Sequence, residues 1–134
     1  MALEDLKGDE MMTHLIGSLE AGKDIGHYGR LVFAMIARHF IDEEEVIHYL
    51  MKDKDCSEEK ARGLLEQVKA RNYIPLKKEP ILEWMGQQRF PICNEPDNPD
   101  ACNVYRNLQF PEQIYQRISE YYEQRAEAAE HVNG

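Results

Sequence analysis

The residues best suited to chemistry in this sequence are a histidine and an arginine at the start of a long apolar stretch. His27 and Arg30 belong to the tetrapeptide HYGR, which is followed by apolar residues as far as Phe40. The N–H groups and the positive dipole end of a helix start favour an anion, and an arginine adds two hydrogen bonds to phosphate oxygens. The tetrapeptide therefore predicts a phosphate contact. The alternative is that His27 caps the helix and Arg30 pairs with a nearby carboxylate.

A second set of candidates combines positive charge with an aromatic ring. Lys69, Arg71, Lys77 and Lys78 lie on both sides of Tyr73. Proteins hold single strands by cation contacts to phosphates and by stacking bases on aromatic side chains. This segment predicts nucleic-acid contacts, with a solvated charged surface as the alternative.

Cys93 and Cys102 are candidate metal ligands, because thiolates bind zinc and iron–sulfur clusters. Two thiolates complete neither kind of site, and nothing in the sequence brings Cys56 toward them. We therefore expect no metal, with burial as small apolar side chains as the alternative role. Three cysteines at irregular spacing do not resemble a disulfide framework either, which indicates a reducing compartment.

Composition narrows the class of protein. The chain has 134 residues, of which 43% are hydrophobic and 31% charged, as in a globular domain. No apolar run is long enough to span a bilayer, and the acidic N-terminus does not resemble a secretory signal, so we expect a cytoplasmic protein without a membrane partner. The net charge of −9 is concentrated in residues 1–21 and 119–134, which leaves the rest of the chain near neutral. A basic patch is therefore compatible with the overall acidity.

These candidates must be positioned by helices, because apolar side chains recur at three- and four-residue steps. Asp42 and Ser57 are typical N-cap residues, and Pro80 and Pro111 suit the first turn of a helix. Tyr73 to Pro75 is predicted to be extended. The segments predicted to be helical are 9–19, 22–40, 43–51 and 57–71, a short one from Pro80 and a last one from Pro111 that presents Tyr115, Tyr121 and Tyr122.

The predicted fold is an all-α bundle of about five to six helices, with a long irregular loop over residues 90–107 before the last helix. We expect a disordered acidic N-terminus over 1–8, a single helical domain over 9–122 and a fraying tail over 123–134. No phosphate-loop, zincin, hydrolase or dinucleotide motif occurs, so the sequence provides no catalytic residues of its own.

In motif order, the chain resembles the C-terminal domain of the archaeal and eukaryotic primase large subunit. The likeness spans roughly Met11 to Tyr105 and rests on HYGR at a helix start, the capped helix DEEEVIHYL, the segment NYIP and the cysteine loop that begins with FPIC. The resemblance implies that His27 and Arg30 contact the triphosphate of the initiating nucleotide or the template phosphates. It also implies single-stranded DNA, ATP or another nucleoside triphosphate, and a primase catalytic subunit or polymerase as partners.

The family domain holds a [4Fe–4S] cluster on four cysteines, and this chain departs from that pattern. Met11 and Met12 stand near the position of the first cysteine, and Lys77 to Glu79 stand near the second. Half of the ligand set is missing, so we expect a form without the cluster and without other cofactors. The competing hypothesis is a helical protein–protein interaction module that binds neither nucleotide nor nucleic acid.

Overall fold

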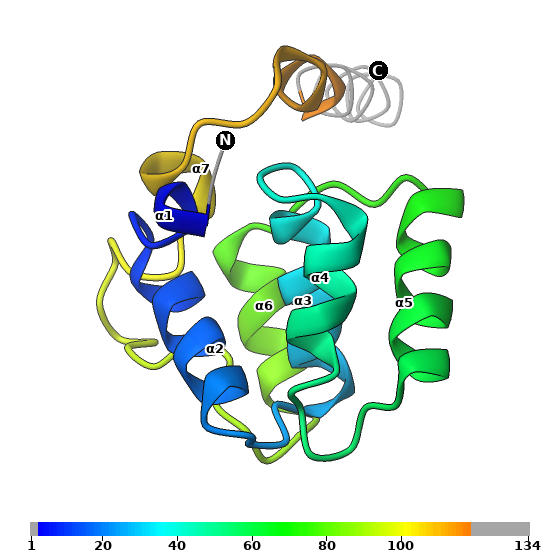
Figure 1. Ribbon diagram of the computed structural model, residues 1–134. Coiled ribbons are helices and arrows are strands. Elements are labelled where there is room, and N and C mark those ends of the chain that lie inside the picture. Colours follow the sequence, from blue (N-terminus) through cyan, green and yellow to red (C-terminus); the bar gives the residue numbers. More distant parts are fainter. Residues whose placement is uncertain (1–2, 119–134) are drawn as a thin grey trace, which may run out of the picture.

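The computed structural model describes residues 3–118, and every regular element in this range is a helix (Figure 1). The prediction of an all-α bundle is confirmed. The helices are α1 (Leu3–Leu6), α2 (Glu10–Glu20), α3 (Gly26–Ala37), α4 (Glu43–Leu50), α5 (Glu58–Ala70), α6 (Lys78–Met85) and α7 (Val104–Asn107). Residues 112–118 are also helical. The predicted tail 123–134, Tyr121 and Tyr122 lie outside the described residues.

Three helices begin at side-chain caps. The carboxylate of Asp9 accepts a hydrogen bond from the Met12 N–H, and that of Asp42 accepts one from the Glu45 N–H. The Ser57 hydroxyl accepts one from the Lys60 N–H at 3.2 Å. Such a bond satisfies one of the N–H groups that a helix start leaves without an intrahelical partner. Both caps that the sequence analysis named, Asp42 and Ser57, are confirmed.

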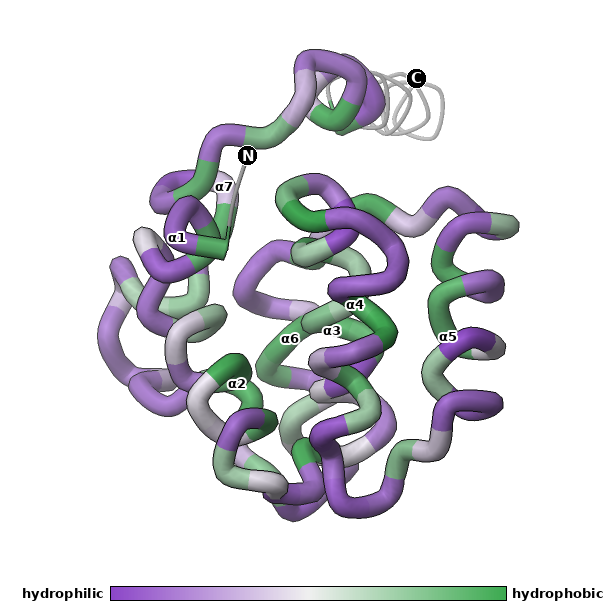
Figure 2. The backbone as a smooth tube through the Cα atoms, viewed as in Figure 1, coloured by the Kyte–Doolittle hydropathy of each residue, from purple (hydrophilic) through white to green (hydrophobic). Residues whose placement is uncertain are grey.

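The core is organised around α3, which contacts α2, α4, α5 and α6. All nine residues from Gly29 to Ala37 are buried, so α3 is surrounded on every side rather than amphipathic. The outer helices turn one apolar face inward, as α5 does with Ala61, Leu64, Leu65 and Val68. In Figure 2, hydrophobic and hydrophilic residues alternate along the tube of α5, because each turn has an apolar side and a polar side.

The beginning of the chain packs against its later part. Leu3–Leu6 form α1 within the segment expected to be disordered, and Leu6 is fully buried. The two carboxylate oxygens of Asp9, itself fully buried, have separate partners. One accepts from the Met12 N–H, and the other accepts from the Asn107 side-chain amide at 2.9 Å. These contacts hold the first helices against the segment that contains α7.

The long segment over 90–107 is irregular as predicted, apart from the single turn α7 near its end. Its middle, residues 94–100, is exposed, whereas Ile92, Cys93, Ala101 and Cys102 are buried. No helix within residues 3–118 is both long enough and apolar enough to cross a membrane.

Candidate functional site

The arginine of the HYGR tetrapeptide is buried and paired. Arg30 is 7% exposed, and its Nη1 lies 3.2 Å from a carboxylate oxygen of Asp24 and 3.2 Å from one of Asp53. The Asp53 side chain has no exposed surface. These contacts agree with the alternative that the sequence left open for Arg30, which is pairing with a nearby carboxylate. A phosphate would have to compete with both aspartates for this guanidinium.

The N–H groups at the start of α3 also have partners within the chain. Those of Ile25 and Gly26 donate to Asp53 and Asp24, each at 2.8 Å, and that of Tyr28 donates to the Gln88 side chain at 3.0 Å. A helix start attracts anions through such groups, and here two carboxylates already occupy it.

His27 does not cap α3. Its side chain is exposed, and its ring packs edge-on against Tyr28 with the centroids 5.5 Å apart. The N-cap residue is Ile25, which makes no side-chain cap bond. His27 and Arg30 therefore point to different environments, and their joint role in binding a phosphate stays a prediction.

The cysteine loop is closed by a disulfide. Cys93 and Cys102 are bonded, with their Cα atoms 5.9 Å apart. The interpretation that the cysteines form no disulfide framework is wrong for this pair, because the turns of the proline-rich loop bring its two ends together in a way that spacing alone does not indicate. As a disulfide, the pair offers no thiolate to a metal.

The third cysteine, Cys56, is a buried free thiol. Burial, more than any of the charged groups around it, raises the pKa of the Cys56 thiol and keeps it protonated. Within residues 3–118, no three His, Cys, Asp or Glu side chains are grouped so as to hold a metal ion.

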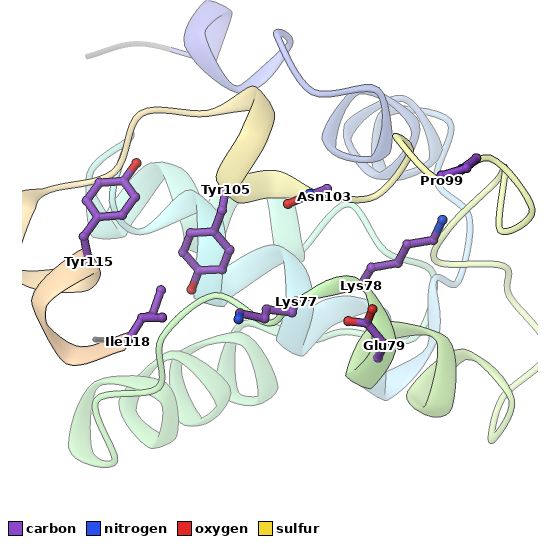
Figure 3. Close-up of a pocket in the computed structure, with 8 residues that line it drawn as sticks. All are labelled: Lys77, Lys78, Glu79, Pro99, Asn103, Tyr105, Tyr115 and Ile118. Atoms are coloured by element: carbon purple, nitrogen blue, oxygen red, sulfur yellow. The ribbon is translucent and has the colours of Figure 1, made fainter. Parts of the chain in front are cut away.

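Two of the predicted nucleic-acid contacts, Lys77 and Lys78, line a cavity of about 680 Å³ that we call the tyrosine–lysine pocket. Its walls come from the start of α6, from Pro99 within the disulfide loop, from Asn103 and Tyr105 at the start of α7 and from residues 112–118. Figure 3 shows Lys77 extending toward the end lined by Tyr105 and Ile118, and Lys78 extending toward Pro99. The lining residues are Lys77, Lys78, Glu79, Pro99, Asn103, Tyr105, Tyr115 and Ile118.

Hydrogen bonds fix the side chains of this pocket. The Tyr105 hydroxyl donates to the Pro75 carbonyl, and the Lys78 ammonium donates to the Asn98 carbonyl. The Tyr115 hydroxyl accepts from the Phe110 N–H at 3.0 Å. Burial, with a smaller contribution from Tyr115, raises the pKa of Tyr105, so this phenol is neutral at physiological pH. The pocket thus has two oriented tyrosine rings beside its lysines.

The remaining predicted contacts have different surroundings. Lys69 lies 2.5 Å from a Glu43 carboxylate oxygen and 3.7 Å from one of Glu66, so its charge is neutralised. The same pairs raise the pKa of Lys69. Arg71 is exposed, and Tyr73 is half-buried against the core. The structure thus separates Lys69 from Lys77 and Lys78.

Three arginines lie at or beside the carboxyl end of α5, and we call them the arginine cluster: Arg71 is the C-cap of this helix, and Arg38 and Arg117 bond to the next residue, Asn72. Arg38 donates to the Asn72 side chain at 3.0 Å and to the Tyr73 carbonyl at 3.1 Å, and Arg117 donates to the Asn72 carbonyl at 2.6 Å. Arg71 is the residue before Asn72. Within the described part of the chain, none of the three takes part in an ion pair.

His39 lies beside this cluster. Its ring packs edge-on against Phe110 with the centroids 6.0 Å apart, and its Nε2 is buried without a hydrogen-bond partner in the described part of the chain. Burial, then Arg38 and Arg117, lower the pKa of His39 from 6.5 to about 4. Burial and then Arg117 also lower the pKa of Arg38. Among the described residues 3–118, Arg38 and Arg117 have no carboxylate as an ion-pair partner.

Sequence reasoning missed Asp53, Gln88, Tyr105 and two members of the arginine cluster, namely Arg38 at the end of α3 and Arg117 in residues 112–118. Asp53 and Gln88 reach α3 from 28 and 60 residues away, respectively, and no local pattern marks them. Tyr105 and Tyr115 flank Phe110 and are spaced ten residues apart in a segment without periodicity. The only sequence signal for these two tyrosines would have been the presence of aromatic residues near the cysteine loop.

Comparisons with protein-family models, with curated proteins and with solved structures find no match to this chain.

Proposed function

We propose that this protein binds single-stranded nucleic acid and a nucleoside triphosphate at the tyrosine–lysine pocket, as an accessory to a primase or polymerase chain. The observation that supports this most directly is that two lysines and two tyrosines line one cavity of about 680 Å³. Lysines contact phosphate oxygens, and aromatic rings stack on bases without reading their sequence. The primase context rests on the motif order that the chain has in common with the large-subunit domain.

The charge in the pocket favours an anionic ligand. The Lys78 ammonium is held by a neutral carbonyl, so its positive charge is not cancelled by that contact. Among the described residues that line the cavity, Glu79 is the only one with a carboxylate. A local positive field of this kind attracts phosphates even on a protein whose net charge is −9.

The proposed role is binding rather than catalysis. Nucleotidyl transfer needs metal ions held by carboxylates, and the described residues contain no group of three or more His, Cys, Asp or Glu side chains placed to hold one. An accessory domain contributes by holding template and nucleotide near a catalytic chain, which raises their effective concentration. The catalytic residues would then belong to the partner chain.

Binding of a labelled single-stranded oligonucleotide, followed by fluorescence anisotropy with and without ATP, tests this proposal. We expect Lys77→Gln and Lys78→Gln each to weaken binding, and each to reduce the slope of log affinity against log salt by about 0.7. Lys54→Gln is the matched control, because it removes the same charge from the exposed loop before α5. Equal effects of all three substitutions would contradict the pocket assignment.

A specific observation favours the second candidate, a protein interaction module. The outer face of α4 and α5 is mixed in sign, because Arg62 bonds to Glu44 and Glu58 while Lys69 bonds to Glu43. This is the charge pattern expected of a surface that does not track a phosphate backbone. Complete absence of oligonucleotide binding at both low and physiological salt would favour this candidate over the first.

A further inference from the structure

We infer that the arginine cluster is a second phosphate-binding site, so that the ligand of this protein is a strand of several nucleotides rather than a single nucleotide. This inference rests on the proposed function. It assigns Arg38, Arg71 and Arg117 a role that the motif order of the chain does not indicate.

The first argument is the imbalance of charge. Arg38 and Arg117 both donate to Asn72, so their guanidinium groups lie close together, yet neither has a carboxylate partner in the described part of the chain. Their acceptors are neutral amide and carbonyl oxygens. One cation is enough to complement the negative end of a helix dipole, so three exceed what α5 needs.

The second argument is unused hydrogen-bonding capacity. A guanidinium has five N–H donors, and the contacts of Arg117 with the described residues use one of its nitrogens. Arg71 is exposed and makes no ion pair within the described residues. Such arginine forks bind phosphate through paired hydrogen bonds.

The third argument is the position of the cluster relative to the tyrosine–lysine pocket. The connector from Tyr73 to Lys77 joins the two, and four residues span at most ~14 Å. A strand of a few nucleotides is long enough to bridge that distance. In Figure 1 this connector runs from the end of α5 toward α6, on the side of the molecule that faces the last helical segment.

Aromatic rings continue across the same region. Phe110 packs against His39 and, with centroids 5.2 Å apart, against Tyr105, whose ring contributes to the pocket. Tyr105 is also 6.4 Å from Tyr115 between centroids. Phe110 is buried and supports the ring of Tyr105 from behind, so the half-buried rings of Tyr105 and Tyr115 are the ones on which bases would stack.

Two measurements test the inference, and both use the full chain. Oligothymidylates of two, four and eight nucleotides are titrated against wild type, Arg71→Gln and the control Lys54→Gln. We expect affinity to rise steeply between two and four nucleotides, and Arg71→Gln to weaken binding of the eight-nucleotide strand about threefold to tenfold while leaving the dinucleotide unchanged. Arg117→Lys keeps the charge but loses the fork, and should weaken the longer strand less than Arg71→Gln does.

The outcomes separate this inference from the proposed function. If Lys77→Gln weakens binding but Arg71→Gln does not, the cluster is not a phosphate site and the pocket alone binds. If the dinucleotide binds as tightly as the eight-nucleotide strand, the inference is likewise overturned. If wild type binds none of the strands at any salt concentration, the proposed function fails as well. Arg71 is exposed, so its replacement should leave the unfolding midpoint unchanged, which circular dichroism verifies.

Discussion

Replacing Arg30 with methionine should destabilise the fold strongly. Methionine fills a similar volume but leaves Asp53, whose side chain has no exposed surface, without its cation. Removing one partner of a buried ion pair costs about 3–5 kcal/mol. The lower end applies here, because Asp53 keeps hydrogen bonds from the Ile25 and Asp55 N–H groups at 2.8 and 2.7 Å. We therefore expect a loss of about 3 kcal/mol in the free energy of unfolding.

Urea denaturation followed by circular dichroism measures this loss. With a slope of about 1.5 kcal/mol per molar urea, the midpoint should fall by about 2 M. The double variant Arg30→Met with Asp53→Asn should lose less than Arg30→Met alone, because it leaves no buried charge without a partner. His27→Ala is the control, since an exposed side chain without a cap bond should change stability by less than about 0.5 kcal/mol.

The same variants distinguish a structural from a phosphate-binding role for Arg30. A loss below about 1 kcal/mol in Arg30→Met, combined with a tenfold loss of oligonucleotide affinity, would refute the reasoning from burial and restore the phosphate contact that the sequence predicts. A large loss of stability with unchanged affinity of the folded fraction is the result that the two aspartates lead us to expect.

The remaining predictions concern acidity, the disulfide and glycine. The pKa of His39 falls from 6.5 to about 4 on folding, so its contribution to stability is present above pH 6.5 and is lost as pH falls toward 4. Since the ring is partly exposed, solvent screening reduces this contribution to about 1 kcal/mol, and His39→Gln should flatten the acid limb of a stability–pH curve. Removing the bond between Cys93 and Cys102, which closes a loop of sequence separation 9, should cost about 2.5 kcal/mol; thermal unfolding of the double serine variant, compared with reduced wild type, measures it. Gly26→Ala should destabilise by more than about 1 kcal/mol, because its φ is +79° and its Cβ would meet the Gln88 side chain, whereas Gly17→Ala in an open helical position should stabilise by about 0.5–1 kcal/mol; denaturant midpoints of the two variants should move in opposite directions.

Local signals were sufficient for most of the helices. The caps at Asp42 and Ser57 act on N–H groups three residues ahead, so a short window of sequence contains both partners. The three- and four-residue spacing of apolar side chains likewise predicts the buried faces of α4 and α5 from a short window of sequence. Helix α1 was missed because its four residues owe their order to the burial of Leu6 against the rest of the fold, which no local pattern records.

The candidate site could be predicted only in part. Lys77 and Lys78 were found because they are adjacent to each other and near Tyr73. Their aromatic partners come from residues about 30 positions later, and the contacts depend on how the cysteine loop folds back. For Arg30 and Lys69 the prediction of a ligand contact did not anticipate their partners. Their types and positions suggested an external anion, but each forms an ion pair with a carboxylate of the chain itself. Side-chain type predicts what a residue can bind, but the partners that folding supplies decide whether it is available.

The two hydrogen bonds of Asp9 have a consequence for the order in which the chain acquires its structure. The Asp9 carboxylate can cap α2 as soon as the first turn of this helix forms. Its second oxygen gains its partner only when the amide of Asn107, 98 residues later, has been added to the chain. During synthesis from the N-terminus, α2 can therefore form early, while the burial of this charge is completed only after nearly the whole described chain has emerged. Contacts of such large sequence separation form late and slow folding. Asp9 thus links α2, which forms near the beginning of the nascent chain, to the segment that contains α7, which emerges much later.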